Sequence, residues 1–351
     1  MLSKVIGGVI GPRARETDRR CRFPRAAVDA LGEAGVLGST VDRSLGGDGR
    51  SLADAVSTVR QVARACASTA TVLQCHFTAV AVLARFGPRR LCADIAAGSH
   101  LGSCAVFDDT VPGDPPATSS RASAGSAVVR IDGSKPLVTA AGEADSYLWS
   151  TRALDGSGTS LWLVSAAAAG LHVPAEQEAL GLRGSGTRSV TADPVTVPAD
   201  ALLGANGDGE RIVQSVVLPW FCALGAAVSL GIMDSAVAAT KDAVAAIRAP
   251  RPGLLAELAR ITLRADSVAV LLRDAVADPG VASGLALRAM AIASAVRVTD
   301  LAMKISQAAS ASTEASIAAE RRFRDARASY AIPPTQDSVF EHIGATLLRN
   351  G

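Results

Sequence analysis

Residues 190–204, with the sequence VTADPVTVPADALLG, contain the boundary that decides the fold. Up to Val197 the stretch is rich in β-branched residues, as strands are. After Gly204 the apolar residues take on helical spacing and keep it to the C-terminus. We expect helices separated by turns that contain Pro and Gly, over residues 210–247, 253–277, 281–309, 314–330 and 336–349. Long helices with short connections predict an antiparallel bundle.

Working back from this boundary, the sequence predicts short strands and then helices. Six further β-rich runs span 101–107, 127–131, 137–139, 146–150, 160–165 and 171–173. Strands at such regular spacing predict a small barrel or sandwich. Before residue 100 the apolar spacing is helical again, and Ser51 is placed to cap one of these helices. The predicted fold is α+β: an N-terminal α-helical domain over 1–100, a β domain over 101–204 and a four-helix-type bundle over 205–351.

The composition excludes several classes of protein. The chain has 351 residues, of which 49% are hydrophobic and 3% aromatic, and its net charge is +2. Disordered chains combine low hydrophobicity with high net charge, which this chain does not. The 35 basic and 33 acidic side chains also lack the basic excess that nucleic-acid binding requires.

Compartment and membrane contact follow from cysteine spacing and from one apolar stretch. The six cysteines show no CxxC pair and no metal-ligand spacing, so we expect free thiols, no metal and a cytoplasmic protein. Residues 212–233 carry no acidic or basic side chain and are long enough to span a bilayer. This apolar stretch also contains Pro219 and several polar or small residues. We therefore expect a buried bundle helix and no membrane contact.

Five sequence motifs resemble motifs of the acyl-CoA dehydrogenase family. They occur in the same order as in that family, and the resemblance extends over nearly the whole chain. They are LGEAGVLG at 31–38 with LGGDG at 45–49, GSKPLVT at 133–139, LGLRGSGT at 180–187, VTVPADALLG at 195–204, and ERRFRDAR at 320–327. The resemblance implies an FAD-dependent oxidoreductase that acts on an acyl group bound to CoA or to an acyl carrier protein. It also implies a homodimer or homotetramer, with part of the FAD reaching a neighbouring subunit, and a flavin reductase or electron-transfer partner.

The catalytic glutamate of the family is missing. Its usual "EGT" position reads Pro333-Pro334-Thr335, and the alternative position early in the first bundle helix, 216–221, has no ionisable side chain. The "PPT" resembles the "APT" of relatives in specialised metabolism. The catalytic base is therefore unknown.

The cofactor positions also depart from the family pattern. The resemblance places Asp108 or Asp109, Leu137, Thr139 and Thr335 beside the flavin, with Leu137 in place of the usual covering tryptophan. Gln307 and Ala308 replace part of a glycine motif that meets the neighbouring subunit's FAD. A Cβ atom at such a position can block close backbone approach.

Three further residues are candidates for substrate binding. Arg183 could hold a phosphate or carboxylate, or pair with a neighbouring acid. Trp220 and Phe221 could line the acyl pocket or belong to the core. Arginines 13, 15, 19, 20, 22 and 25 are either a solvated helix face or a docking site for an acidic carrier protein.

Three functions remain open at this stage. The first is a flavin-dependent monooxygenase, which needs no base for an α-proton. The second is ordinary α,β-desaturation with a relocated base such as Asp108 or Glu314. In the third, the chain has kept the fold, lost FAD, and acts as a non-redox enzyme or a binding and assembly partner.

Overall fold

The computed structural model describes residues 1–108, 118–125, 127–175, 179–308 and 313–349. Its described helices are α1 (Leu2–Val5), a π-helical turn (Ile6–Ile10), α2 (Gly11–Arg19), α3 (Arg25–Glu33), α4 (Leu52–Ala65), α5 (Ala67–Phe86), α6 (Arg89–Ala96), α7 (Gly209–Ile212), a second π-helical turn (Val213–Val217), α8 (Leu218–Ala245), α9 (Pro252–Ala277), α10 (Val281–Ala308), α11 (Thr313–Ala328) and α12 (Gln336–Arg349). Its described strands are β1 (Gly102–Ala105), β2 (Arg121–Ala124), β3 (Val128–Val138), β4 (Ser146–Arg152), β5 (Thr159–Ser165), β6 (Leu171–His172), β7 (Arg188–Pro198) and β8 (Leu202–Leu203).

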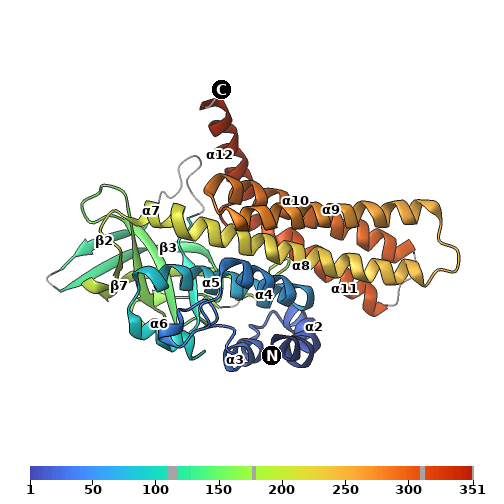
Figure 1. The fold of residues 1–351 in the computed structure, drawn as a ribbon. Coiled ribbons are helices and arrows are strands. Elements are labelled where there is room, and N and C mark those ends of the chain that lie inside the picture. The colour runs from blue at the N-terminus through green and yellow to red at the C-terminus, as the bar shows by residue number, and fades with distance from the viewer. Residues whose placement is uncertain (109–117, 126, 176–178, 309–312, 350–351) are drawn as a thin grey trace.

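The predicted order of helices, strands and bundle is confirmed, and the three parts lie side by side (Figure 1). Helices α8 to α11 run lengthwise as a bundle, the N-terminal helices lie along it, and the strands lie at one end. Helix α12 stands out from the body, away from the N-terminus.

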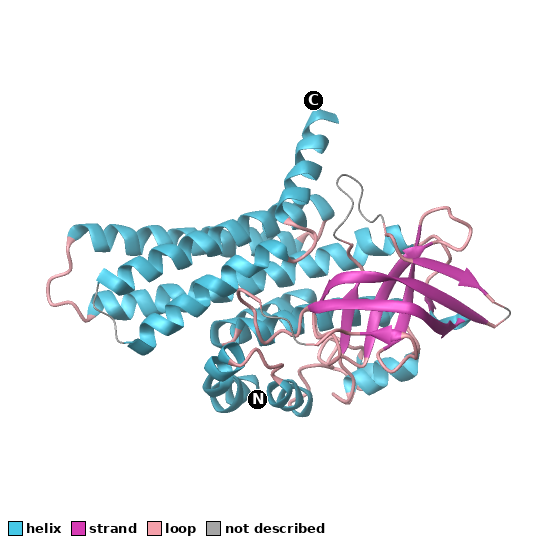
Figure 2. Cartoon of the chain, turned by 180° about the vertical axis from the view of Figure 1, so that it is seen from behind, coloured by secondary structure: helices cyan, strands magenta, loops and turns pink. Residues whose placement is uncertain are grey.

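The β domain is made of two four-stranded sheets, seen in magenta in Figure 2. One has the order β1-β4-β5-β8 and the other β2-β3-β7-β6. Strand β1 pairs with β4 in parallel, and the other pairings are antiparallel. Three buried aromatic side chains, Tyr147, Trp149 and Trp162, fill the space inside.

Two strand predictions were wrong in detail. The runs at 127–131 and 137–139 are parts of one strand, β3, which keeps pairing with β7 across two irregularities in register. Gly133 makes this possible, because its φ of +144° is open to glycine and its Cα lies against Ser120. Strands β2 and β8 were not predicted. They are short, and pairing with β3 and β5 defines them more than their own sequences do.

The predicted helix over 210–247 is interrupted near its start. A π-helical turn separates α7 from α8, and Pro219 lies in the first turn of α8. Proline has no backbone N–H, so it fits at a helix start better than inside one. The interruption therefore lies where the sequence cannot form a continuous α-helical ladder.

The N-terminal and bundle helices share one apolar core. Ser51 caps α4 as predicted, since its hydroxyl accepts from Asp54 N at 3.3 Å while the Asp54 carboxylate accepts from Ser51 N. Among the described residues, three helices are long and apolar enough to cross a membrane, by length and composition only. For the helix over Gly209–Ala245, 94% of the most apolar window is buried inside the protein. Packing against other helices accounts for its apolar character, as expected.

Candidate functional site

Strand β3 holds two of the motif residues in different surroundings. Lys135 is buried, and its Nζ donates to Asp108 at 2.6 Å, to Ser150 Oγ at 2.7 Å and to Thr118 Oγ1 at 2.9 Å. The register of β3 against β7 shifts between Lys135 and Val138. This irregularity lets Lys135 and Val138 both point inward, although they are three positions apart, and leaves Leu137 half-buried at the edge of a pocket.

Asp108 belongs to the Lys135 network. The two side chains are 2% and 1% exposed, and Asp108 also accepts a hydrogen bond from Ser119 N at 2.7 Å. Burial lowers the pKa of Lys135 to about 8, while Asp108 acts in the opposite direction. The hypothesis that Asp108 is a relocated base therefore meets a physical obstacle. If the Asp108 carboxylate took up a proton or turned away to the substrate, Lys135 would be left buried and unpaired. Asp109 lies outside the described residues.

The chain turns at Thr139, a predicted flavin neighbour, and this turn packs against the LGLRGSGT loop. Thr139 Oγ1 lies 3.1 Å from Thr187 Oγ1, which lies 2.8 Å from Ser185 Oγ. Backbone bonds from Ala140 N to Ser185 O and from Ala141 N to Gly186 O, both 2.9 Å, hold the two segments together. A chain of three hydroxyls is thus fixed at the end of β3 and β7.

The same loop is attached to the bundle through the ERRFRDAR motif. Asp325 is buried and accepts a hydrogen bond from Leu182 N at 2.7 Å, and burial raises the pKa of its carboxyl to about 6. Gly181 lies so close to α11 that a Cβ there would overlap the backbone carbonyl of Arg324. Arg324 in turn pairs with Asp18 at 2.6 Å, so Arg324 and Asp325 together tie α11 to the N-terminal segment and to the LGLRGSGT loop.

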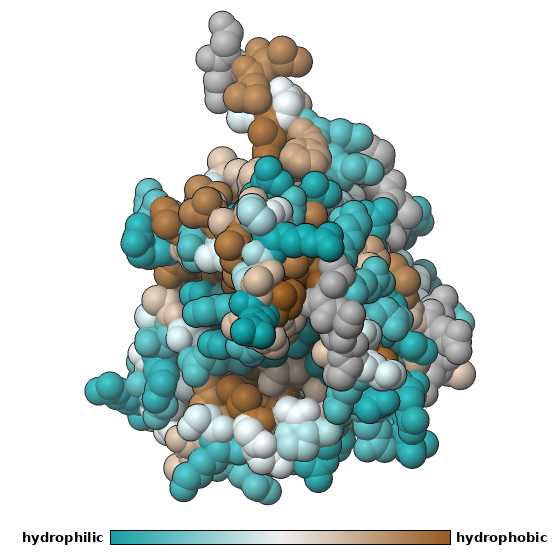
Figure 3. All heavy atoms as spheres, turned by 90° about the vertical axis from the view of Figure 1, so that its right-hand side faces the viewer, coloured by the Kyte–Doolittle hydropathy of each residue, from teal (hydrophilic) through white to brown (hydrophobic). Residues whose placement is uncertain are grey.

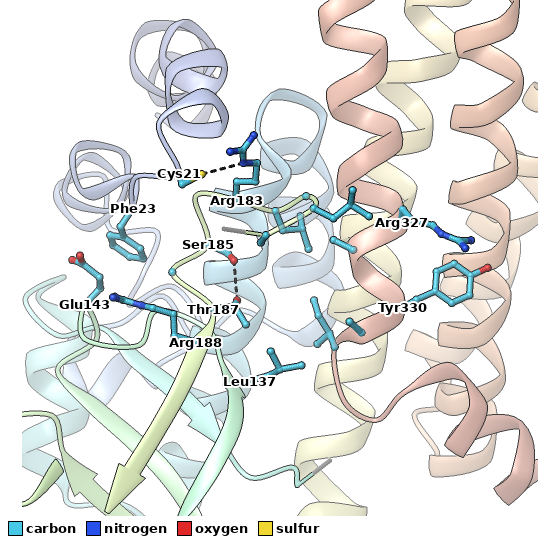
Figure 4. A pocket seen from close by; sticks show the side chains of 18 residues that line it. Cys21, Phe23, Leu137, Glu143, Arg183, Ser185, Thr187, Arg188, Arg327 and Tyr330 are labelled. Carbon is cyan, nitrogen blue, oxygen red and sulfur yellow. Dashed lines mark hydrogen bonds between the residues drawn. The ribbon is translucent and has the colours of Figure 1, made fainter. Parts of the chain in front are cut away.

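These contacts enclose a pocket of about 320 Å³ between the β domain, the N-terminal segment and the end of α11 (Figure 4). The volume is at the lower end of the roughly 300–1,000 Å³ typical of ligand pockets. Its lining residues are Cys21, Phe23, Leu137, Glu143, Ala179, Leu180, Gly181, Leu182, Arg183, Ser185, Gly186, Thr187, Arg188, Arg327, Ala328, Tyr330, Ala331 and Ile332.

The charge of the pocket lining is positive. It contains Arg183, Arg188 and Arg327, while the carboxylate of Glu143 already pairs with Arg25 at 2.6 Å. Arg183 donates its Nε hydrogen to Cys21 Sγ at 3.0 Å and forms no ion pair with a described acid. It therefore retains donors that an anion could accept from, and its role in binding a phosphate or carboxylate stays a prediction.

The remaining predicted residues are not among those that line the pocket. Pro333 is buried, Phe221 packs against Phe107 with ring centroids 5.1 Å apart, and Trp220 is half-buried. Thr335 precedes α12, and its Oγ1 accepts from Ser338 N at 3.5 Å, which is the contact of a helix cap.

The two α10 residues predicted to meet a neighbouring FAD lie away from this pocket. Gln307 and Ala308 end α10, at the end of the bundle opposite the strands (Figure 1), and Gln307 is exposed. Glu314, the other hypothetical base, is exposed at the start of α11 beside them. Glu314 is not among the residues that line the pocket with Leu137.

Sequence reasoning missed one charged residue near Phe221. Arg288 is 3% exposed, and its guanidinium carbon lies 5.3 Å from the centre of the Phe221 ring. The signal was available, because Arg288 is a lone charge in the apolar run Leu285–Ile292. Among the described residues no group of His, Cys, Asp and Glu side chains could hold a metal ion.

The helical domain, paired sheets and bundle around this site define the acyl-CoA dehydrogenase fold. Residues 1–95 match the family "Acyl-CoA dehydrogenase, N-terminal domain". The chain is 26% identical over 336 residues to a mitochondrial short-chain specific acyl-CoA dehydrogenase of Sus scrofa, covering 90% of this chain and 81% of that protein. The match to the human protein of the same name spans 52% of its length.

Solved structures agree over nearly the whole chain. Butyryl-CoA dehydrogenase from Megasphaera elsdenii superposes with a TM-score of 0.89 at 21% identity, covering 99% of this chain and 96% of that one. The prolyl acyl carrier protein oxidase AnaB superposes with a TM-score of 0.88 at 18% identity, covering 99% and 97%. The chain therefore has the acyl-CoA dehydrogenase fold, and its sequence is similar to proteins named as acyl-CoA dehydrogenases.

Proposed function

We propose that the protein is a flavin-dependent oxidoreductase whose substrate is an acyl thioester of CoA or of an acyl carrier protein. One observation carries the proposal: the pocket joins Leu137, at the predicted flavin position, to Ile332, which directly precedes the predicted base position. The solved relatives include one named for butyryl-CoA and one named for a carrier-bound prolyl group, so both kinds of carrier support the substrate class.

The described residues fit an FAD ring at this pocket. Leu137 and Ile332 supply apolar walls, and Thr187 supplies a hydroxyl that is already fixed by two neighbours. Arg183 and Arg188 favour negative charge at the mouth. When bound, FAD would supply the two-electron redox chemistry that no side chain here can perform.

The chain itself supplies no carboxylate at either predicted base position. Pro333 is buried, the stretch 216–221 has no ionisable group, and Asp108 is held by Lys135. Within the proposal we therefore favour oxygenation over desaturation, with one oxygen atom of O₂ entering the acyl group and the other leaving as water. The two electrons come from the reduced cofactor, and a flavin reductase or another electron-transfer partner would resupply them.

A flavin-binding experiment tests the class. The purified protein is incubated with FAD, freed of unbound cofactor by gel filtration, and its visible absorption is recorded. We expect a flavin band that Leu137→Asp abolishes and that Leu154→Asp, an exposed leucine elsewhere in the β domain, leaves intact. A colourless protein under all conditions would refute the redox proposal and favour the non-redox or assembly role.

A second experiment separates oxygenation from desaturation. Reduced flavin, ¹⁸O₂ and an acyl thioester are supplied together, and the product is examined by mass spectrometry for one added ¹⁸O atom. Unchanged turnover without oxygen, with an artificial electron acceptor, would refute oxygenation and restore the dehydrogenase alternative.

We also propose that the protein works as a cytoplasmic homodimer or homotetramer. Helix α12 leaves the body (Figure 1), and its side chains Phe340, Leu347 and Leu348 are exposed. Figure 3 shows hydrophobic spheres, in brown, on the segment that projects from the body. Exposed apolar side chains gathered in this way mark a surface for a partner. A monomer in sedimentation velocity at micromolar concentration would contradict this part of the proposal.

A further inference from the structure

Arg288 is a buried cation without an acidic partner. It lies in α10 and is 3% exposed, and no described acidic side chain forms an ion pair with it. By contrast, the buried cation Lys135 pairs with Asp108. Burial without a countercharge lowers the pKa of Arg288 and costs free energy that must be recovered elsewhere.

The hydrogen bonds of Arg288 account for only part of its donors. Its Nη2 donates to Ile332 O at 2.6 Å and its Nε to Pro334 O at 3.4 Å. A guanidinium has five N–H donors in a planar fork. Within the described part of the chain, Nη1 has no hydrogen-bond partner, so one arm of the fork is available to a ligand.

A second donor lies beside that free arm. Gln74 is buried, and its Nε2 donates to Phe221 O at 3.0 Å, which leaves the other amide hydrogen available. Both nitrogens converge over Gly225: a Cβ there would lie 2.8 Å from Gln74 Nε2 and 3.0 Å from Arg288 Nη1. Because Gly225 has no side chain, the two donors can both lie against this position of α8.

The donors lie between the two positions that frame the predicted reaction site. Arg288 contacts Phe221, at the predicted acyl pocket, and holds the carbonyls on either side of Pro333, at the predicted base position. A group bound by Nη1 and Gln74 would therefore belong to the acyl part of the substrate, rather than to its carrier.

We propose that Arg288, with Gln74, recognises a carboxylate on the acyl chain, so that the substrate is the monothioester of a dicarboxylic acid. The inference rests on the proposed function and deepens it by naming the acyl class. A carboxylate supplies the missing countercharge and accepts from both donors, and such charge-assisted bonds are the strong ones in proteins. An uncharged chain would leave the guanidinium unpaired.

Binding of two matched thioesters tests the proposal. Glutaryl-CoA and valeryl-CoA have acyl chains of equal carbon number and differ in the terminal carboxylate, and each is also loaded through phosphopantetheine onto an acyl carrier protein. Affinities are measured by calorimetry for the wild type, Arg288→Met and Gly225→Ala. The control is Arg322→Met, which removes a bundle arginine bonded to Ser235. Thermal unfolding of each variant verifies that it is folded.

We expect the wild type and Arg322→Met to bind the glutaryl thioester about tenfold tighter or more. Arg288→Met should lose this preference, and Gly225→Ala should reduce it while keeping the charge, because its methyl group displaces both donors. Equal affinity for the two thioesters in the wild type overturns the inference and leaves the proposed function standing. In that case the role of Arg288 would be structural only, holding the segment 332–334 through its two carbonyl hydrogen bonds. Failure of both thioesters on both carriers overturns the proposed function together with the inference.

Discussion

Replacing Asp108 by Asn leaves Lys135 in the β domain without its countercharge. The Lys135 ammonium is 1% exposed, so water cannot replace the carboxylate. Breaking a buried pair in this way costs about 3–5 kcal/mol. Lys135 could instead lose its proton on folding, and at pH 7 that costs about 5 kcal/mol from an unfolded pKa of about 10.4. Both routes give a loss in unfolding free energy of about 3–5 kcal/mol.

Urea unfolding followed by tryptophan fluorescence measures this loss, since Lys135 lies 5.8 Å from the centre of the Trp149 ring. The pH dependence has a fixed sign. The folded pKa of Lys135 is about 8 in the wild type and lower without Asp108, so the wild type binds more protons below pH 8. The advantage of the wild type must therefore shrink as pH rises from 7 towards 9.

A double variant provides the control. Asp108→Leu with Lys135→Met removes both charges and should recover much of the lost stability, since a buried pair is often no better than an apolar one. Two results would refute this reasoning. One is a loss below about 1 kcal/mol that does not change with pH. The other is an Asp108→Asn protein of unchanged stability that no longer turns over, which would make Asp108 the relocated base.

Three further predictions concern single positions. His76 accepts from Gly102 N and donates to Leu37 O, and burial lowers its pKa to about 4. Between pH 6.5 and 4 the unfolded chain therefore binds a proton that the folded chain does not, so the stability advantage of the wild type over His76→Gln should fall by about 3 kcal/mol across that range in urea titrations. A difference that stays constant with pH would contradict the assignment. Gly181→Ala should cost about 1–3 kcal/mol and weaken flavin binding, because its Cβ meets the backbone of α11, and unchanged values in both assays would show that the loop has room to move. Ser51→Ala should lower stability by about 1 kcal/mol without affecting ligands, as loss of a helix cap does, and a thermal melt that matches the wild type would show that the cap contributes nothing.

The order of elements and most of their bounds were predictable because they depend on local patterns. Apolar spacing identified the helices, and the capping box at Ser51 and Asp54 follows from the sequence between residues 51 and 54. By contrast, β3 was predicted as two strands, because a bulge is defined by the register of the partner strand β7 and leaves little trace in its own sequence.

The sequence by itself determined the fold class, the boundary near residue 204 and the absence of a carboxylate at Pro333 and in 216–221. The tertiary structure alone decided which charges meet. Asp108 and Lys135 are 27 positions apart and form a buried pair, whereas Arg288, which is also buried, meets no described acid. The physical reason is that spacing along the chain fixes which face of an element a residue occupies. Whether a buried charge finds a partner depends on what other elements bring to the same place.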